Sequence, residues 1–277
     1  MTEARGATGA AYRDGAFLVA LDVDGTTIHH DGTMSPRVRD AVRAVARAGH
    51  HIVIATGRSV IATLPVISEL GLKHGYAVCS NGAITLQLDS GLPGGYEILE
   101  TVTFDPAPAL NLLRGSWPDA VVAVEEVGVG FKLSAPFPDG ELQGTLRVVP
   151  WEELVSAPAT RVTFRSPSGT SEDFLELVER IGLHGVNYAV GFTAWLDINP
   201  EGVSKGTALE QVRRRLGVEP SSTVAVGDQR NDLEMLRWAA RGVAMGQAPV
   251  EVQDVADEVT LDVDEDGLVP VLRSLLV

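Results

Sequence analysis

Two aspartates, Asp22 and Asp24, follow a short apolar stretch at residues 17–21, and Gly25 comes directly after them. The apolar and β-branched residues predict a buried strand that delivers both carboxylates at its carboxyl end. Side chains two residues apart on a strand point to opposite faces, so both carboxylates meet one substrate only if the chain bends after Asp22. Gly25 permits such a bend. One carboxylate as nucleophile and one as general acid and base suit phosphoryl transfer, whereas a solvated, Asp-rich turn is the alternative interpretation.

A second group of charged residues lies toward the C-terminus. Lys205 opens a pattern of helical spacing, and the apolar segment 223–226 leads into a loop that contains Asp228 and Asp232. That segment predicts a second buried strand that ends in carboxylates. Ligands of open α/β sheets bind beyond the carboxyl ends of the strands. The carboxylates and the lysine at such an edge therefore predict a hard divalent cation beside a phosphate.

Between these two groups, Thr56 and Gly57 follow another apolar segment, residues 52–55, and precede Arg58. A hydroxyl group and the amides at the N-terminus of a following helix are good ligands for phosphate. The segment therefore predicts a phosphate-binding loop. The alternative is that Thr56 and Arg58 only cap a helix and solvate its first turn.

These motifs need a sheet that brings the ends of several strands together. We expect strands near residues 18–22, 52–55 and 77–79, and a helix at 36–48 that Gly49 ends. Strands that alternate with helices indicate parallel pairing. The predicted fold class is therefore α/β, with a Rossmann-like parallel sheet as core and an inserted α+β domain.

The interval before Lys205 carries the pattern of that inserted domain. Pro- and Gly-rich turns separate two expected helices, at 106–113 and 171–181, from a set of strand-like segments. These segments are 98–104, 121–124, 130–133, 161–164, 186–190 and 194–198. An insert of this size is large enough to be a domain. We therefore divide the chain into a flexible N-terminal tail at 1–14, a core at 15–85 and 195–277, and an inserted domain at 86–194.

The composition describes an acidic protein. The chain has 277 residues and a formal net charge of −15, so nucleic acid and anionic membranes are not expected partners. No stretch is apolar and long enough to predict a membrane span. The single cysteine, Cys79, excludes an intramolecular disulfide and fits a reducing compartment. We therefore expect a cytoplasmic protein, and the sequence does not indicate its oligomeric state.

In their order along the chain, the short motifs resemble those of the haloacid dehalogenase (HAD) superfamily of aspartyl-phosphate hydrolases. The match is to the Cof-type, subclass IIB branch, in which a C2-type cap domain is inserted after the third core strand. The motifs are Leu-Asp-Val-Asp-Gly-Thr at 21–26, Ala-Thr-Gly-Arg at 55–58, Ser-Asn-Gly-Ala at 80–83, Gly-Val-Ser-Lys-Gly at 202–206 and Gly-Asp-Gln-Arg-Asn-Asp at 227–232. The resemblance implies the HAD fold, with the inserted domain as a cap that closes over the active site.

The resemblance implies catalytic roles for Asp22, Asp24, Thr56 and Lys205. Asp22 would attack phosphorus and form an aspartyl-phosphate, and Asp24 would protonate the leaving alkoxide and then accept a proton from water. Thr56 would hold the phosphoryl oxygens, and Lys205 would neutralise charge on the nucleophile and the phosphoryl group. An Asp rather than a Thr at position 24 favours rapid hydrolysis or mutase chemistry over a persistent acyl-phosphate.

The resemblance also implies Mg²⁺ as the cofactor. Asp22, the backbone carbonyl of Asp24 and Asp228 would bind the ion, with water completing an octahedron. Asn231 and Asp232 would support this site through hydrogen bonds.

Substrate binding is implied for Gly57, Arg58 and Asn81, although Asn81 before a glycine is also a common turn residue. Gln229 stands where the family often has glycine in its metal loop. The leaving group would contact the cap, where the candidate charges Glu125, Lys132, Arg161 and Arg165 could equally lie on a solvated strand face.

The predicted function is Mg²⁺-dependent hydrolysis of a small phosphorylated metabolite, a sugar phosphate or a cofactor phosphate. The expected partner is therefore a small-molecule phosphate ester. A phosphomutase that returns the phosphoryl group from Asp22 to a sugar is one alternative. A non-catalytic metabolite-binding protein is the other, and it is disfavoured because Asp22, Asp24 and Lys205 are all present.

Overall fold

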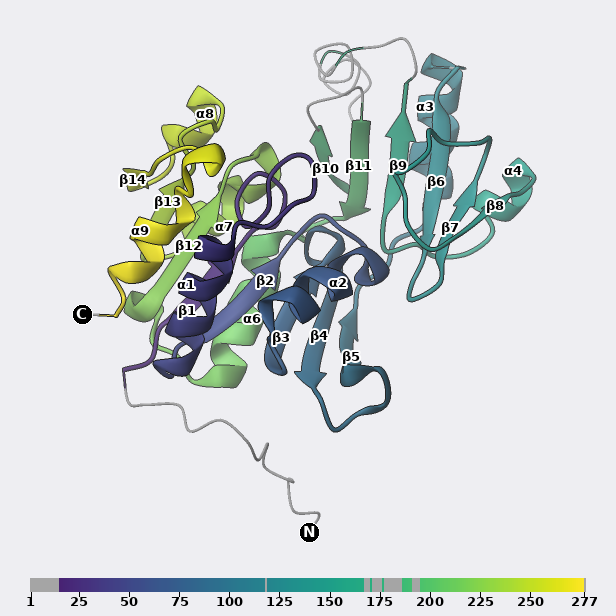
Figure 1. Cartoon of the computed structure of the whole chain (residues 1–277). Helices are drawn as coiled ribbons and strands as arrows, with labels where there is room; N and C mark the ends of the chain where they lie inside the picture. The colour runs from purple at the N-terminus through teal and green to yellow at the C-terminus, as the bar shows by residue number, and fades with distance from the viewer. Residues whose placement is uncertain are drawn as a thin grey trace.

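Two β-sheets organise the protein (Figure 1). The computed structural model describes residues 15–117, 119–166, 170, 176, 186–190 and 195–276. The eight-stranded core sheet has the strand order β14-β13-β12-β1-β2-β3-β4-β5. Its strands are β1 (Leu18–Leu21), β2 (His51–Ala55), β3 (His74–Cys79), β4 (Ile84–Asp89), β5 (Tyr96–Thr101), β12 (Thr223–Gly227), β13 (Arg241–Ala244) and β14 (Glu258–Val259).

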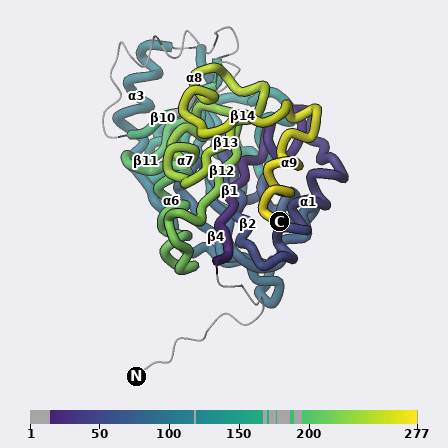
Figure 2. The backbone as a smooth tube through the Cα atoms, turned by 90° about the vertical axis from the view of Figure 1, so that its left-hand side faces the viewer, coloured from purple at the N-terminus to yellow at the C-terminus, as the bar shows by residue number. Residues whose placement is uncertain are grey.

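Helices cover both faces of the core sheet. Figure 2 shows α1 (Pro36–Arg47) and α9 (Leu268–Arg273) on one side, and α6 (Lys205–Leu216) and α7 (Leu233–Trp238) on the other. Along β1, Val19 packs in the core cluster of α1 and α9, whereas Leu18 packs with α6 and α7. Both side chains are fully buried because a parallel strand is covered on its two faces, which explains the unbroken apolar run in the sequence.

The topology brings the expected motifs to one edge of the sheet. β1 pairs in parallel with both β12 and β2, and β2 pairs in parallel with β3. The carboxyl ends of these four strands therefore open on the same side. The segments that follow them contain Asp22, Thr56, Asn81 and Asp228, so the edge where an α/β sheet binds ligands is also where the polar residues gather.

The second sheet lies at the upper right of Figure 1 and has the order β10-β11-β9-β6-β7-β8. Its strands are β6 (Val121–Glu126), β7 (Gly130–Leu133), β8 (Thr145–Val148), β9 (Val162–Arg165), β10 (Val186–Val190) and β11 (Trp195–Pro200). All pairs are antiparallel except β7 with β8. Residues of α3 (Ala107–Ser116) and α4 (Trp151–Leu154) pack in one core cluster with residues of β6, β9 and β11. This unit is called the cap below.

The observed architecture confirms the predicted α/β fold class, and it changes where some segments belong. Residues 98–104 were expected in the inserted domain, but β5 pairs with β4 and extends the core sheet by an antiparallel hairpin. β11 begins at Trp195, which was assigned to the core, yet β11 pairs with β9 and β10 in the cap. We therefore propose that the cap extends from about residue 102 to 200. Apolar alternation predicts that a strand forms but not which sheet it joins.

The sequence also predicted a helix at 171–181, a flexible tail at 1–14 and no membrane span. The expected helix at 171–181 and the tail at 1–14 lie outside the described residues, apart from Glu176. Within the described ranges, no helix is both long and apolar enough to cross a membrane.

Candidate active site

The chain bends between Asp22 and Asp24 as the sequence predicts. The backbone amide of Asp22 still donates to the Val226 carbonyl at 3.0 Å, so Asp22 remains on the end of the sheet and is buried. The Asp24 side chain is 54% exposed. Gly25 has a φ of +78°, and a Cβ at this position would lie 2.3 Å from an Asp228 carboxylate oxygen. A side chain at residue 25 is therefore excluded both by its backbone conformation and by the neighbouring carboxylate.

Lys205 links the two groups of carboxylates. Its Nζ donates to Asp22 Oδ1 and to Asp232 Oδ1, both at 2.6 Å, and the side chain is fully buried. Ser204 and Thr207 form a capping box that fixes Lys205 as the first residue of α6. Burial disfavours the charge, but the two carboxylates outweigh it and raise the pKa of Lys205 above its ordinary value. Lys205 is therefore a fixed cation beside Asp22.

Asp232 shapes the loop after β12. Its Oδ2 accepts hydrogen bonds from the backbone amides of Asp228 at 3.0 Å and Gln229 at 2.9 Å. Gly227 allows this packing, because a Cβ there would lie 2.5 Å from the Asp232 carboxyl carbon. Both oxygens of Asp232 are therefore engaged, one by Lys205 and the other by the loop backbone.

Three buried carboxylates, those of Asp22, Asp228 and Asp232, lie with ligand atoms within 4.8 Å of one another. Burial and the charge of Asp232 raise the pKa of Asp22 well above its usual range, and the same causes raise the pKa of Asp228 to about 6. One lysine does not balance three carboxylates. The cluster is therefore short of positive charge when all three are ionised.

A divalent cation fits this cluster by charge and by donor chemistry, since hard cations prefer carboxylate oxygens. Among the described residues, only Lys205 donates to the Asp22 carboxylate, and it uses Oδ1. Asp228 accepts from neutral side chains on both oxygens, from Thr26 at 3.3 Å, Gln229 at 3.0 Å and Gln247 at 3.4 Å. Asp22 Oδ2 therefore has no donor among the described residues and Asp228 is hydrogen-bonded by no cation, whereas Asp232 positions Lys205 and the loop.

The expected phosphate-binding loop follows β2. The Thr56 hydroxyl is buried and accepts from the backbone amide of Arg58 at 3.1 Å. The Ser59 side chain caps α2 (Val60–Leu70), which begins directly after the loop. The backbone N–H of Asn81 donates to the Thr56 carbonyl at 3.0 Å and so connects the segment after β3 to this loop. Ser59 rather than Thr56 or Arg58 therefore caps the helix, and Gly57 and Arg58 line the same cavity as Asp22.

Asn81 lies where three segments meet. It adopts a φ of +54° and accepts a hydrogen bond from Asn231 Nδ2 at 3.0 Å. Its own Nδ2 donates to Asn199 Oδ1 at 3.3 Å and faces Asp197 Oδ2 at 3.4 Å, both in the cap. The side chain therefore joins core loops to the cap and does more than form a turn.

An ion pair that the sequence did not predict holds Asp24. Arg58 donates Nε to Asp24 Oδ2 at 2.8 Å and Nη2 to Asp24 Oδ1 at 2.6 Å. Such a two-pronged pair fixes both side chains at the rim of the site. Arg58, which was predicted to bind substrate, thus also lies beside the predicted general acid.

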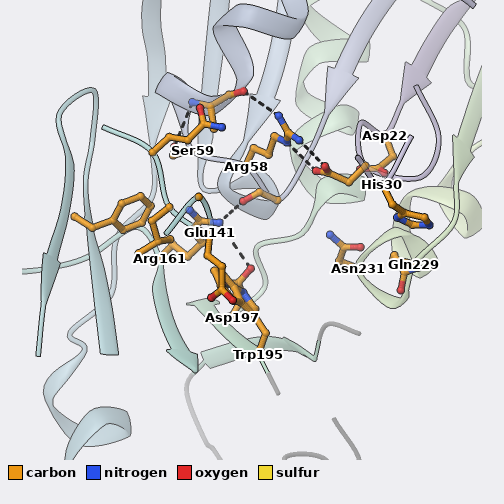
Figure 3. A pocket seen from close by; sticks show the side chains of 17 residues that line it. Asp22, His30, Arg58, Ser59, Glu141, Arg161, Trp195, Asp197, Gln229 and Asn231 are labelled. Carbon is orange, nitrogen blue, oxygen red and sulfur yellow. Dashed lines mark hydrogen bonds and ion pairs between the residues drawn. The ribbon is translucent and has the colours of Figure 1, made fainter. Parts of the chain in front are cut away.

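A cavity of about 560 Å³ lies between the strand ends and the cap. Figure 3 shows that residues of both units line it, with Asp22, Arg58 and Asn231 from the core and Arg161 and Asp197 from the cap. The walls therefore combine a possible nucleophile with side chains that would face a leaving group.

The predicted site residues fall into three positions around this cavity. Asp22, Asp24, Gly57, Arg58 and Asn231 line it. Thr56, Lys205, Asp228 and Asp232 are buried beside these. Asn81 lines a smaller cavity of about 250 Å³ together with Lys205 and Asn231.

The cap residues that line the cavity were harder to predict from the sequence. Of its four candidate charges, Arg161 lines the cavity and Glu125 is buried beside it, whereas Lys132 and Arg165 are paired with neighbouring cap glutamates. Trp195, Asp197 and Asn199 were missed. They alternate along β11 and so share one face, and this polar alternation within an apolar strand was the available signal.

Known proteins resemble this chain in sequence and in fold. A family model described as haloacid dehalogenase-like hydrolase matches residues 19–93 and 151–272. Phosphatase YwpJ of Bacillus subtilis (strain 168) is 28% identical over 94% of this chain and 99% of its own length. Phosphoglycolate phosphatase of Natronomonas pharaonis is 30% identical over 92% of this chain and 95% of its own length. The HAD subclass IIB sugar phosphatase BT4131 shares the fold, with a TM-score of 0.78 at 24% identity over 94% of this chain and 98% of its own.

Proposed function

Since this chain belongs to the haloacid dehalogenase-like hydrolases and is a phosphatase of that family, we propose that it hydrolyses a small phosphate monoester through an aspartyl-phosphate on Asp22. Substrates of this kind include sugar phosphates and cofactor phosphates. The proposed cofactor is Mg²⁺.

The reaction divides into two displacements at phosphorus. In the first, a carboxylate oxygen of Asp22 bonds to phosphorus while the bond to the leaving oxygen breaks, and Asp24 gives its proton to that oxygen. In the second, water attacks the aspartyl-phosphate and transfers a proton to Asp24, which releases inorganic phosphate and restores Asp22. Asp24 therefore ends each cycle protonated as it began.

In this scheme Arg58 can bind either Asp24 or the incoming phosphoryl group. It holds Asp24 at the cavity wall in the structure. Phosphoryl oxygens are good partners for a guanidinium, so substrate would compete with Asp24 for Arg58 and free the carboxyl group to protonate. Thr56 and the amides of the same loop would hold the remaining phosphoryl oxygens.

The metal site that we propose consists of Asp22, Asp228 and the backbone carbonyl of Asp24, with Asn231 and Asp232 in support. Bound Mg²⁺ would neutralise charge on the phosphoryl oxygens. Lys205 contributes a second positive charge at Asp22 that does not depend on the metal.

The observation that carries the proposal is the environment of the Asp22 carboxylate. Lys205 fixes one oxygen at 2.6 Å, and Asp22 lines the cavity as part of a cluster of three carboxylates that one lysine does not balance. A buried acid that only stabilised the fold would have no need of a cavity at its side.

The test is the release of inorganic phosphate from a panel of phosphorylated sugars and cofactors, with Mg²⁺ and with EDTA. We expect release that depends on Mg²⁺ and that is lost in Asp22→Asn, whose side chain is nearly isosteric. Isomerisation of a sugar phosphate with little phosphate release would favour a phosphomutase. Binding without turnover would favour a non-catalytic protein.

A further inference from the structure

The cap end of the cavity is lined by two carboxylates, Glu141 and Asp197, and by the rings of Phe131 and Trp195 (Figure 3). Arg161 is the cationic side chain that the cap contributes among the described lining residues. What this end of the cavity can bind therefore depends on whether Arg161 is available to a ligand.

Arg161 is buried among groups of the protein, and its Nε has no hydrogen-bond partner among the described residues. Only 5% of the residue is exposed, and its Nη1 donates to the carbonyl of Gly57 in the phosphate-binding loop. The guanidinium lies 3.7 Å from Glu125 Oε2 and 3.8 Å from Asp197 Oδ2. Two carboxylates thus surround one cation, so no net positive charge remains at this position for an anionic ligand.

The neighbouring arginine, Arg165, is paired with a carboxylate of the cap. Arg165 binds Glu141 through Nε and Nη2, both at 3.1 Å, and its Nη1 donates to the Ser166 carbonyl. It therefore neutralises Glu141 in part but is not among the residues that line the cavity.

Asp197 keeps the capacity to accept from a ligand. Thr163 and Trp195 donate to its Oδ1 at 2.7 and 3.0 Å, whereas within the described part of the chain its Oδ2 has only the long contacts to Asn81 and Arg161. A hydroxyl or ammonium group would find an acceptor there. A second phosphate or a carboxylate would meet the like charge of Asp197 and Glu141 there.

We infer that the cap selects a leaving group that is neutral or cationic, carries hydroxyl or ammonium donors, and has an apolar face for the half-buried ring of Trp195. The inference rests on the proposed function, since it concerns the alcohol that leaves when phosphate is transferred. The carboxylates disfavour bisphosphates and phosphorylated acids, and Arg161 joins the cap to the loop that follows β2 through the Gly57 carbonyl.

Three probes that differ mainly at the far end from the phosphate test this selection. Glucose 6-phosphate has a neutral leaving group, glucosamine 6-phosphate a cationic one, and 6-phosphogluconate an anionic one. We expect kcat/KM for 6-phosphogluconate to be lower than for the other two by roughly tenfold or more. p-Nitrophenyl phosphate serves as a probe of the catalytic residues alone.

The variant Glu141→Gln tests whether the carboxylates at the cap end of the cavity cause this selection against anionic leaving groups. This change removes a carboxylate from the cavity and releases Arg165, so the ratio of kcat/KM for 6-phosphogluconate to that for glucose 6-phosphate should rise several-fold. Glu126→Gln is the matched control, because Glu126 also pairs with an arginine, Arg147, but does not line the cavity. Its ratio should equal that of the wild type.

The outcomes separate the inference from the function. Hydrolysis of p-nitrophenyl phosphate together with 6-phosphogluconate turnover equal to or above that of the neutral sugar overturns the inference and leaves the function standing. Hydrolysis of p-nitrophenyl phosphate but of none of the three sugars also overturns it. Failure to hydrolyse any of the four with Mg²⁺ overturns the proposed function, and the inference with it.

Discussion

At the scale of single residues, the ion pair between Asp24 and Arg58 bears directly on the proposed chemistry. A carboxylate that serves as acid and base must be held near the reacting oxygen yet be free to exchange a proton. Arg58 provides the first condition by binding both oxygens of Asp24. Arrival of a phosphoryl group would provide the second, by drawing Arg58 away.

Replacement of Asp24 tests its role as acid and base. Asp24→Asn keeps the shape but cannot give or take the proton, so we expect kcat to fall by roughly 10²–10⁴-fold with the fold intact. Steady-state phosphate release measures kcat, and circular dichroism checks the fold. Asp264→Asn is the control, since Leu-Asp-Val-Asp recurs at 261–264 but Asp264 is exposed and pairs with His29. Equal losses in the two variants would argue against a special role for Asp24.

The carboxylate cluster predicts how stability depends on pH and metal. Burial raises the pKa of Asp228 to about 6, and Asp22 is shifted in the same direction. The metal-free native state therefore holds protons that the unfolded chain releases near pH 4. Its free energy of unfolding should fall as the pH rises from about 4 to about 6, because the raised pKa makes ionisation costly in the folded state.

A bound divalent cation would offset the free-energy cost of ionising Asp22 and Asp228 in the folded state. The increase in melting temperature on adding Mg²⁺ should accordingly be larger at pH 7.5 than at pH 5, and it should be lost in Asp228→Asn. Thermal unfolding with Mg²⁺ and with EDTA at the two pH values measures this. An increase of the same size at both pH values would contradict the metal site proposed here.

Among the connecting elements, the turn after β1 sets the geometry of the site. Gly25 adopts a φ of +78° and leaves no space for a Cβ beside Asp228. Gly32 has a similar φ of +84°, but a Cβ there would meet nothing within 4 Å. The two glycines therefore separate backbone strain from steric conflict.

Alanine at these two positions should have different effects. Gly32→Ala should cost about 1 kcal/mol of stability, from the left-handed conformation alone, and keep its activity. Gly25→Ala should also displace Asp228, so we expect kcat to fall by roughly 100-fold or more and the stabilisation by Mg²⁺ to be lost. Phosphate release and thermal unfolding compare the two. Equal effects would mean that the close contact with Asp228 is unimportant.

The elements also show which parts of the protein could be predicted from sequence. Strand ends such as Asp22 and Asp228 were predictable because parallel strands are apolar throughout and stop at conspicuous polar residues. The pairing of β5 with β4 was not, since a half-exposed antiparallel strand carries no mark of its partner. Asp197 was missed for a related reason: its importance comes from Asn81 and Arg161, which are distant in sequence and meet it only in the fold.

At the scale of the whole molecule, the cap and the core meet through buried polar contacts. Ser80 donates to Glu125 Oε2 at 2.6 Å, Asn199 donates to the Ser80 carbonyl at 3.0 Å, and Arg161 reaches the Gly57 carbonyl. All three contacts end on segments that follow core strands at the active site. The position of the cap is therefore coupled to the loop that would hold the phosphoryl group.

Arg161→Lys tests this coupling. Lysine keeps the charge but cannot bind Gly57 and face two carboxylates at once, so the cap should be held less firmly. We expect kcat/KM to fall by roughly tenfold to a hundredfold, and by a similar factor for neutral and anionic substrates. Kinetics on glucose 6-phosphate and 6-phosphogluconate provide the comparison. A fall in kcat/KM confined to 6-phosphogluconate would show instead that Arg161 binds the second anionic group of the substrate.

The central claim is that Asp22 carries the phosphoryl group, and its most direct test is peptide mass spectrometry on enzyme quenched with acid during turnover with Mg²⁺. The account predicts that the peptide containing Asp22 gains the mass of one phosphoryl group, that fragmentation places it on Asp22, and that Asp22→Asn gains none. Turnover without a phosphorylated enzyme, or a phosphoryl group on another residue, would contradict it.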